Sequence, residues 1–342
     1  MVNDLYIFFF LAIFLFIINI SLKKFSINLD TISKDEIHKS LLRSDNSTPL
    51  SGTYFFLPIL IYLFYQIDII LVIFCSLFFL IGLLSDVKLV SSYKLRLIAQ
   101  FLLLSFLFFT SKEIIINTRV SFLDNLMNYD VTRILVCTFF FMVLINGFNL
   151  IDGTNCLCCI NLLVIVIFIF LLCHDLNIEY LNSELKILIL SLTIFLLFNF
   201  FGKNFLGDGA AYGLGFLVGY ILVNITIKNN TISPYFVANL LWYPAFENLF
   251  SILRRNFSHK NNYLPDNNHL HQLIFKYLKI KKFTNKTFLL SSIVGIIINL
   301  VLFIFFYVGY IFYNYTVTQV FLILSGIFLY LITYYILSHK LK

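Results

Sequence analysis

Charged residues are scarce in this chain: Asp, Glu, Lys and Arg make up only 12% of its 342 residues, against 60% hydrophobic residues. The mean hydropathy is +0.93. A protein dissolved in water needs far more charge on its surface, so this composition excludes a soluble globular protein. No stretch between the apolar runs is long enough for a separate soluble domain. We therefore treat residues 1–342 as a single integral membrane domain.

Three further absences narrow the class of protein. The first apolar run has no basic segment before it and no small-residue cleavage site, and Lys23 and Lys24 follow it. We expect a retained anchor there instead of a signal peptide. No inverted repeat typical of transporters is evident. The six cysteines lie in or beside apolar runs. No histidine stands at ligand spacing near the group Cys156, Cys158 and Cys159, which favours packing over a metal or redox site there.

Long apolar runs define the fold class. Roughly 20 apolar residues cross a bilayer as a helix, because hydrocarbon offers the backbone no hydrogen-bond partners. The sequence predicts an all-α, polytopic membrane protein with eleven transmembrane helices, the second and third forming a tight hairpin. The predicted helices are 5–22, 52–66, 67–84, 95–111, 131–147, 156–174, 185–201, 210–227, 235–253, 287–310 and 317–338.

Lys and Arg divide unevenly between the two alternating sets of gaps. Nineteen fall in one set and five in the other. Because basic residues are retained on the cytoplasmic side, we predict an N-out, C-in protein of the inner (plasma) membrane. The net charge of +7 then reflects topology and contact with anionic membrane lipids. No nucleic acid partner is expected, and the oligomeric state stays open, with a homodimer among the options.

The polar clusters fall in alternate gaps and therefore share the face predicted to be cytoplasmic. Distant segments of the chain can meet there in one site. The loops expected to form this site are 23–51, 85–95, 147–156, 202–210 and 254–286.

Asp208 lies between Gly207 and Gly209 at the mouth of a predicted helix. Glycines allow a ligand to approach the backbone closely, and a carboxylate offers hard oxygen atoms for Mg²⁺. The later glycines, Gly215 and Gly219, fit close helix packing instead. An unpaired acid at membrane depth is costly, which favours a functional role for Asp208.

Two other clusters carry carboxylate or amide groups. Asn149 and Asp152 are three residues apart and share a helix face if the helix continues, and Asn155 follows them. Such groups suit a nucleotide base and ribose, although Asn and Asp are also ordinary cap and turn residues. Asp86 precedes several basic residues, so it is either a carboxylate beside a phosphate-binding cluster or a common helix-end residue.

The longest predicted cytoplasmic loop holds Arg254, Arg255, His269 and His271. Arginines can bind phosphate oxygens with two parallel hydrogen bonds, and two nearby histidines can donate to a diphosphate. A zinc site at His269 and His271 is a weaker alternative, because its third ligand would have to be an acid needed elsewhere.

Five motifs run in order between about His38 and Gln272. Together they resemble the polyprenyl-phosphate N-acetylhexosaminyl-1-phosphate transferases of glycosyltransferase family 4. The two spaced histidines resemble the GlcNAc-1-phosphate branch more than the peptidoglycan branch, which has consecutive histidines. The motifs are Pro49–Gly52; Gly82–Asp86 with Lys94, Arg96 and Gln100; Asn146–Leu157; Asn199 with Phe205–Gly209; and Glu247 with Arg254–Arg255 and Asp266–His271.

The resemblance implies transfer of a sugar-1-phosphate from a UDP-N-acetylhexosamine to a polyprenyl (undecaprenyl) phosphate, with release of UMP, at the start of cell-surface glycan synthesis. It implies Mg²⁺ as cofactor, with Mn²⁺ as an alternative, and Asp208 as the metal ligand. Asp86 and Asp208 are the expected catalytic residues. The expected substrate-binding residues are Asn149, Asp152, Asn155, Asn199, Arg254, Arg255, His269 and His271.

Three positions depart from the family pattern. Ser85 stands where the family usually has the first of two aspartates, and Thr53 and Cys156 stand where glycine is usual. A lipid phosphate is mostly dianionic at neutral pH, since its second pKa is about 6, so it needs positioning more than deprotonation. We therefore expect an active enzyme. The alternatives are a catalytically silent relative that binds lipid phosphate and a lipid or solute transporter.

Overall fold

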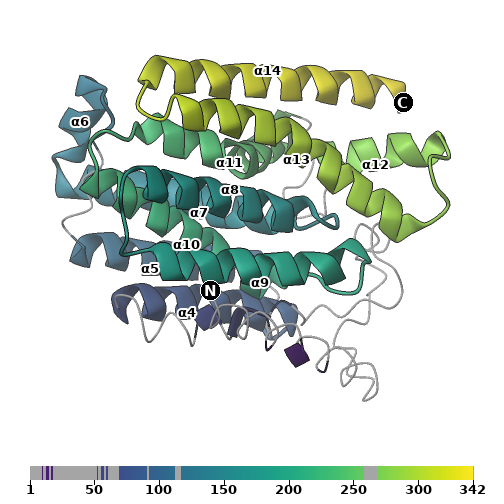
Figure 1. Cartoon of the computed structure of the whole chain (residues 1–342), viewed down its shortest axis with the longest axis horizontal. Helices are drawn as coiled ribbons and strands as arrows, with labels where there is room; N and C mark the ends of the chain where they lie inside the picture. The colour runs from purple at the N-terminus through teal and green to yellow at the C-terminus, as the bar shows by residue number, and fades with distance from the viewer. Residues whose placement is uncertain are drawn as a thin grey trace.

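The computed structural model describes residues 69–90, 92–111, 117–257 and 268–341, with a few positions between residues 10 and 60. These residues form helices and no strand, and the long helices lie side by side (Figure 1). The helices are α4 (Ile69–Asp86), α5 (Tyr93–Thr110), α6 (Ser121–Met127), α7 (Asp130–Ile151), α8 (Leu157–Asp175), α9 (Asn182–Phe200), α10 (Gly207–Lys228), α11 (Pro234–Phe257), α12 (Leu270–Ile280), α13 (Thr287–Ile311) and α14 (Thr316–Lys340).

The structure confirms an all-helical, multi-pass membrane protein. In the described residues, eight helices are long and apolar enough to cross a membrane: α4, α5, α7, α8, α9, α10, α13 and α14. Each coincides with a predicted span. A ninth predicted span, 235–253, corresponds to α11, which is less apolar and contains Pro244 and Glu247. The first two predicted spans, 5–22 and 52–66, lie mostly outside the described residues, as does loop 23–51.

Helix α12 is a departure from the expected loop over residues 254–286. Leu270, Leu273 and Phe275 are buried against the bundle, whereas Lys279 is exposed. This pattern is an amphipathic helix lying at the end of the bundle. With 11 residues it is too short to cross a membrane, so the apolar pattern that identifies spans does not reveal it within the loop.

Helix α10 occupies the centre of the bundle and packs against α4 and α7. In its apolar 18-residue stretch, 78% of the residues are buried, compared with 22% in the corresponding stretches of α5 and α14. Small residues allow this central position. A Cβ atom on Gly82 of α4 would lie 2.3 Å from the carbonyl oxygen of Asp208, so the two backbones nearly touch there.

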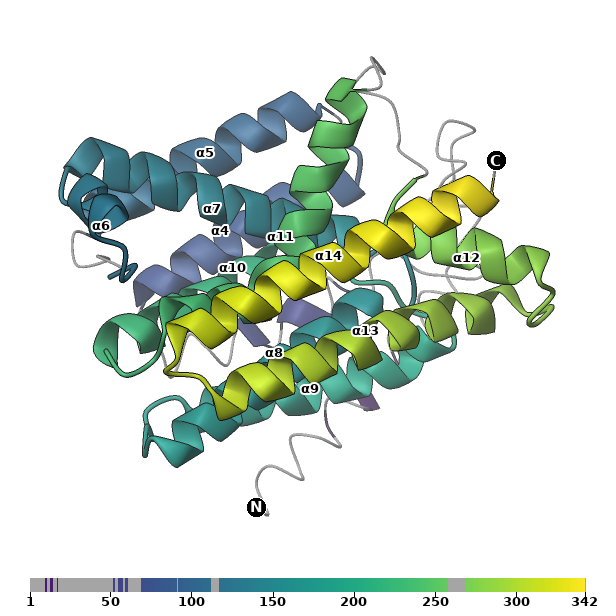
Figure 2. The same cartoon turned by 90° about the horizontal axis from the view of Figure 1, so that it is seen from above.

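The helices alternate in direction and bring the predicted site loops to one end of the bundle. The end of α4, the end of α7 and the start of α10 meet there through hydrogen bonds. Helix α12 and the C-terminus lie toward one end of the bundle and α6 toward the other (Figure 2). Parts of three of the five predicted site loops, 85–95, 147–156 and 202–210, therefore lie together. Which side of the membrane this end faces stays a prediction.

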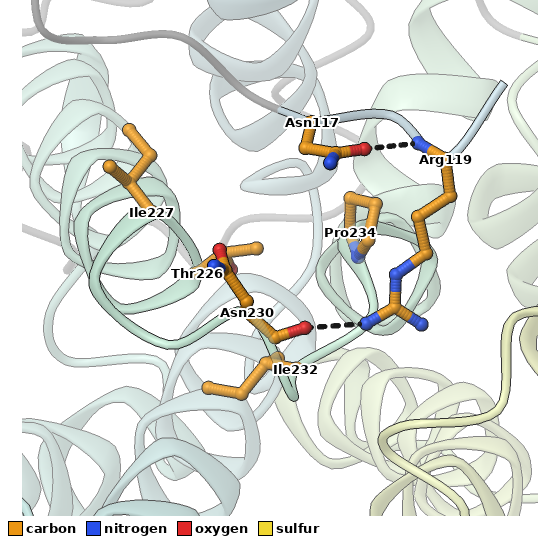
Figure 3. Close-up of a pocket in the computed structure, with 7 residues that line it drawn as sticks. All are labelled: Asn117, Arg119, Thr226, Ile227, Asn230, Ile232 and Pro234. Atoms are coloured by element: carbon orange, nitrogen blue, oxygen red, sulfur yellow. Dashed lines mark hydrogen bonds between the residues drawn. The ribbon is translucent and has the colours of Figure 1, made fainter. Parts of the chain in front are cut away.

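Arg119 ties loops together at the opposite end. Its guanidinium donates to the carbonyl oxygens of Asn230 and Asn314, at 2.8 Å each, and so joins the α10–α11 and α13–α14 connections. A small cavity of about 60 Å³ lies beside it, between Thr226 and Pro234 (Figure 3). This volume holds only a few water molecules, so we assign the cavity no ligand.

The predicted orientation is testable by cysteine labelling. Lys279→Cys lies on α12 and Asn128→Cys lies between α6 and α7, and both positions are exposed. In intact cells, a membrane-impermeant thiol reagent should modify Asn128→Cys and leave Lys279→Cys unmodified until the membrane is opened. The six native cysteines are all buried, so the unsubstituted chain is the control. Labelling of Lys279→Cys in intact cells would show that the topology is the reverse of the predicted one.

Candidate functional site

Asp208 is the centre of a polar network built from four helices. Its Oδ1 atom accepts a hydrogen bond of 2.7 Å from Asn149 Nδ2 of α7. Its Oδ2 atom accepts from Ser85 Oγ at the end of α4 and from Arg96 in the first turn of α5, each at 2.7 Å. The Asp208 and Arg96 side chains are 20% and 19% exposed. The pair is thus open to a ligand while largely shielded from solvent.

Asp86 and Asp152 hold the start of α10. The two carboxylate oxygens of Asp86 accept the backbone N–H groups of Asp208 and Gly209 at 3.0 Å each, and Asp152 Oδ2 accepts that of Gly207 at 3.1 Å. The first N–H groups of a helix have no partner within it, and the positive end of its dipole attracts carboxylates. Both carboxylates therefore position the backbone that carries Asp208.

Glycine is required at the entry to α10. Gly207 has a φ of 71°, a left-handed conformation that favours glycine. The preceding loop also contacts Gly52, whose N–H donates to the carbonyl oxygen of Phe205 at 3.0 Å. A Cβ atom on Gly52 would overlap the carbonyl group of Leu206. The rest of the predicted Pro49–Gly52 motif, together with Thr53, lies outside the described residues.

Asn199 joins two loops of the site. This buried side chain accepts the N–H group of Cys156 on Oδ1 and donates from Nδ2 to the carbonyl oxygen of Asn204, both at 2.6 Å. Asn155 is also buried, and its N–H group donates to Ser291 Oγ at 3.0 Å. Both residues thus fasten the 152–156 turn to neighbouring helices. Their predicted contacts with substrate stay predictions.

Glu247 organises the part of the site formed by α11 and α12. This buried carboxylate binds His269 Nδ1 at 3.0 Å and accepts the hydroxyl of Tyr330 at 2.8 Å. Arg254 donates to the hydroxyl of Tyr334 at 2.6 Å and to the carbonyl oxygen of Asn268. Arg255 donates to Ser251 Oγ at 3.1 Å. The arginine and histidine motif is therefore anchored to α11 and α14.

His271 links this second cluster to the first. It is fully buried, its ring stacks on that of His269 with centroids 5.5 Å apart, and neither ring nitrogen has a hydrogen-bond partner in the described part of the chain. A Cβ atom on Gly153 would lie 2.6 Å from His271 Nε2, which places the ring against the 152–156 turn. Burial lowers the pKa of His271 to about 3. His271 is therefore a neutral hydrogen-bonding group at physiological pH.

The donor set around Asp208 is compatible with Mg²⁺. Mg²⁺ in phosphate-transferring sites is often held by one or two carboxylates, with water and substrate phosphates completing its shell. Asp208 supplies one accessible carboxylate, because Asp86 and Asp152 are occupied by the backbone of α10. Over the described residues, no three His, Cys, Asp or Glu side chains gather to hold a metal.

Two residues of the network, Arg96 and Ser85, were not among the site residues predicted from the sequence. Arg96 was named only within a motif and in the basic cluster after Asp86, and Ser85 only as a departure from the family pattern. The structure shows that both contact Asp208 directly. The signal that could have identified Arg96 is its place in an apolar helix, where an arginine needs a partner.

Residues 69–226 match the model of the family described as Glycosyl transferase family 4. The matched segment runs from α4 to the end of α10 and contains the complete Asp208 network. Over this segment, the match agrees with the family resemblance expected from the motifs, and it supports a transferase that moves a sugar-1-phosphate to a polyprenyl phosphate. No curated protein matches the chain.

The role of Asp86 as a helix cap gives a specific expectation. Loss of an N-cap side chain typically costs about 0.5–2 kcal/mol, and asparagine caps nearly as well as aspartate. Asp86→Ala should therefore lower the free energy of unfolding by about 1 kcal/mol and reduce activity. Asp86→Asn keeps one acceptor oxygen for the two N–H groups of Asp208 and Gly209, so it should lose less of both than Asp86→Ala. Thermal unfolding in detergent and UMP release measure the two effects. A normally folded Asp86→Asn variant without activity would show instead that the charge itself takes part in the reaction.

Proposed function

We propose that this chain transfers an N-acetylhexosamine-1-phosphate, with GlcNAc-1-phosphate as the favoured group, from a UDP-sugar to a polyprenyl phosphate and releases UMP. The observation that carries the proposal is the junction of Asp208, Arg96 and Asn149 at one end of a membrane bundle. A carboxylate, a guanidinium and an amide at this depth can meet a lipid phosphate and a water-soluble nucleotide together.

The reaction exchanges one phosphorus–oxygen bond for another. An oxygen of the lipid phosphate forms a bond to the phosphorus that carries the sugar, and the bond from that phosphorus to the bridging oxygen breaks. UMP leaves with the bridging oxygen. The main obstacle is repulsion between phosphate groups, so positioning and charge compensation supply most of the catalysis. Arg96 provides positive charge at the junction, and Asn149 orients Asp208.

Asp208 is the residue proposed to hold Mg²⁺, and Mn²⁺ is an acceptable substitute in such oxygen-rich sites. When bound, the cation would neutralise phosphate oxygens of the two substrates. The rigid N-terminus of α10, fixed by Asp86 and Asp152, keeps the Asp208 carboxylate in one place for this purpose. Asp208 therefore depends on its backbone supports as much as on its own charge.

The nucleotide is proposed to lie over the 152–156 turn, with Asn149, Asp152, Asn155 and Asn199 on its side of the site. Arg254, Arg255, His269 and His271 would lie toward the diphosphate. The contact of His271 with Gly153 supports this arrangement, because it brings the α11–α12 cluster against the turn. As a neutral imidazole, His271 would donate one N–H group without adding positive charge. We propose the cytoplasmic face of the plasma membrane for the site.

A catalytically silent relative is the second candidate, and Ser85 is the observation that favours it. Its hydroxyl occupies the place of a usual carboxylate and donates to Asp208. If the missing carboxylate is essential, the chain binds lipid phosphate without turning it over. The deciding experiment supplies purified protein with Mg²⁺, undecaprenyl phosphate and a panel of UDP-sugars, with UMP release as the measurement. A transporter would likewise release no UMP.

Asp208→Asn should lower turnover by two or more orders of magnitude, because loss of the metal ligand removes several kcal/mol of charge stabilisation. The asparagine can still accept hydrogen bonds from Ser85 and Arg96, so thermal unfolding should change little. Asp175→Asn at the opposite end of α8 is the matched control, since Asp175 contacts Tyr310 and lies away from the site. Near-normal UMP release by Asp208→Asn would remove Asp208 from the mechanism.

Activity should follow the ionisation of the lipid phosphate, rising through about pH 6 and then levelling off. Ser85→Asp is the paired test: a rate equal to or above that of the unsubstituted chain is expected, because positioning already suffices. Activity that exists only in Ser85→Asp would establish the silent relative as the correct description.

A further inference from the structure

We propose that Arg96 is a phosphate-binding residue that Asp208 holds in position until a divalent cation takes its place on the carboxylate. The inference rests on the proposed function, since it assigns a phosphate to the Asp208 junction. It adds an exchange of partners. Asp208 would release Arg96 and bind the cation, and Arg96 would release Asp208 and bind the phosphate.

The hydrogen bonds of Arg96 leave part of its guanidinium unused. One terminal nitrogen, NH1, serves both Ser85 Oγ and Asp208 Oδ2. The Nε atom is buried and has no hydrogen-bond partner within the described residues. An unpaired buried N–H group is costly, and arginine typically binds phosphate with two parallel donors. The unused Nε–H group is therefore available to a phosphate oxygen.

The location of Arg96 suits a group that meets a lipid phosphate. It lies in the first turn of α5, whose later residues are apolar, and Gln100 one turn further on accepts a hydrogen bond from Asn146 at 2.7 Å. Arg96 thus stands where a membrane-spanning helix reaches the polar junction. A phosphate arriving from the lipid side would come within reach of it while its isoprenoid chain stays in hydrocarbon.

Electrostatics makes Arg96 and the cation competitors. The guanidinium of Arg96 bonds to Asp208 Oδ2 at 2.7 Å. A divalent cation bound to the same carboxylate would repel the guanidinium at this short distance. A phosphate placed between them would attract both. Cation and phosphate should therefore strengthen each other's binding, and thermodynamic linkage requires this effect to be equal in both directions.

Ser85 fits the same arrangement. Its hydroxyl contacts both Arg96 and Asp208, so it fixes the guanidinium beside the carboxylate without adding negative charge. A carboxylate at this position would pair with Arg96 and leave Asp208 freer for a cation. The serine of this chain therefore strengthens the competition between Arg96 and the cation.

The test measures binding of Mn²⁺, used as a spectroscopic probe, to the purified full-length chain in detergent, with and without inorganic phosphate. The unsubstituted chain should bind Mn²⁺ weakly alone and about tenfold or more tightly with phosphate, a typical coupling between linked sites. Arg96→Gln should bind Mn²⁺ more tightly than the unsubstituted chain when phosphate is absent, and phosphate should improve its binding little. Asp208→Asn should abolish the signal.

Lys279→Gln is the matched control, because it removes the same charge from an exposed position on α12 and should leave both measurements unchanged. Arg96→Lys keeps the charge but has a single donor group; it should preserve the competition and weaken the effect of phosphate, and it serves if Arg96→Gln fails to fold. Unchanged or weaker Mn²⁺ binding by folded Arg96→Gln without phosphate would overturn the inference. Absence of UMP release with these binding changes intact would overturn only the proposed function.

Discussion

The capping of α10 is the interaction on which the rest of this structure depends. Three backbone N–H groups at its start are bound by side chains from the ends of α4 and α7. Those helices pack against α10. The capping hydrogen bonds therefore fix the positions of α4 and α7 along the axis of α10 as well as their closeness to it. A shift of either helix along its axis would break hydrogen bonds in a region where few alternatives exist. The position of Asp208 therefore follows from the assembly of the whole central bundle.

Each acidic side chain described in the site has a hydrogen-bonding partner. The acids Asp86 and Asp152 face backbone N–H groups, Asp208 faces Arg96, and Glu247 is surrounded by His269, Leu270 and Tyr330. Buried carboxylates are tolerated only with such partners. Each of these acids therefore has a hydrogen-bonding or basic partner, even though the chain as a whole carries a net charge of +7. A substrate phosphate would encounter Arg96 already bound to Asp208, and this pairing must be exchanged.

Much of the architecture could be predicted from the sequence because membrane helices leave a strong apolar pattern. The alternate polar gaps also placed Asp208, Asn149, Asp152 and Asp86 in one region. The sequence could not assign their partners. An aspartate at a helix end fits a cap, a ligand or a catalytic acid equally well, and the helix that Asp86 and Asp152 cap is distant in the chain. Likewise, the lowered pKa of His271 depends on its burial in the first turn of α12, a helix in a segment that the sequence predicts as a loop.

The turn before α8 has a consequence for how this protein can diverge. Cys156 is a non-glycine residue with a φ of 66°, and its N–H group is held by Asn199. Left-handed backbone costs a residue with a side chain about 1–2 kcal/mol, which is least for asparagine or aspartate and absent for glycine. Proline is excluded because it has no N–H group for the hydrogen bond to Asn199. β-Branched residues are excluded because they do not tolerate the left-handed backbone conformation. The residues that can replace Cys156 are therefore a few with small or amide side chains. Glycine at this position would relieve the backbone strain but would lose the packing of the buried cysteine side chain.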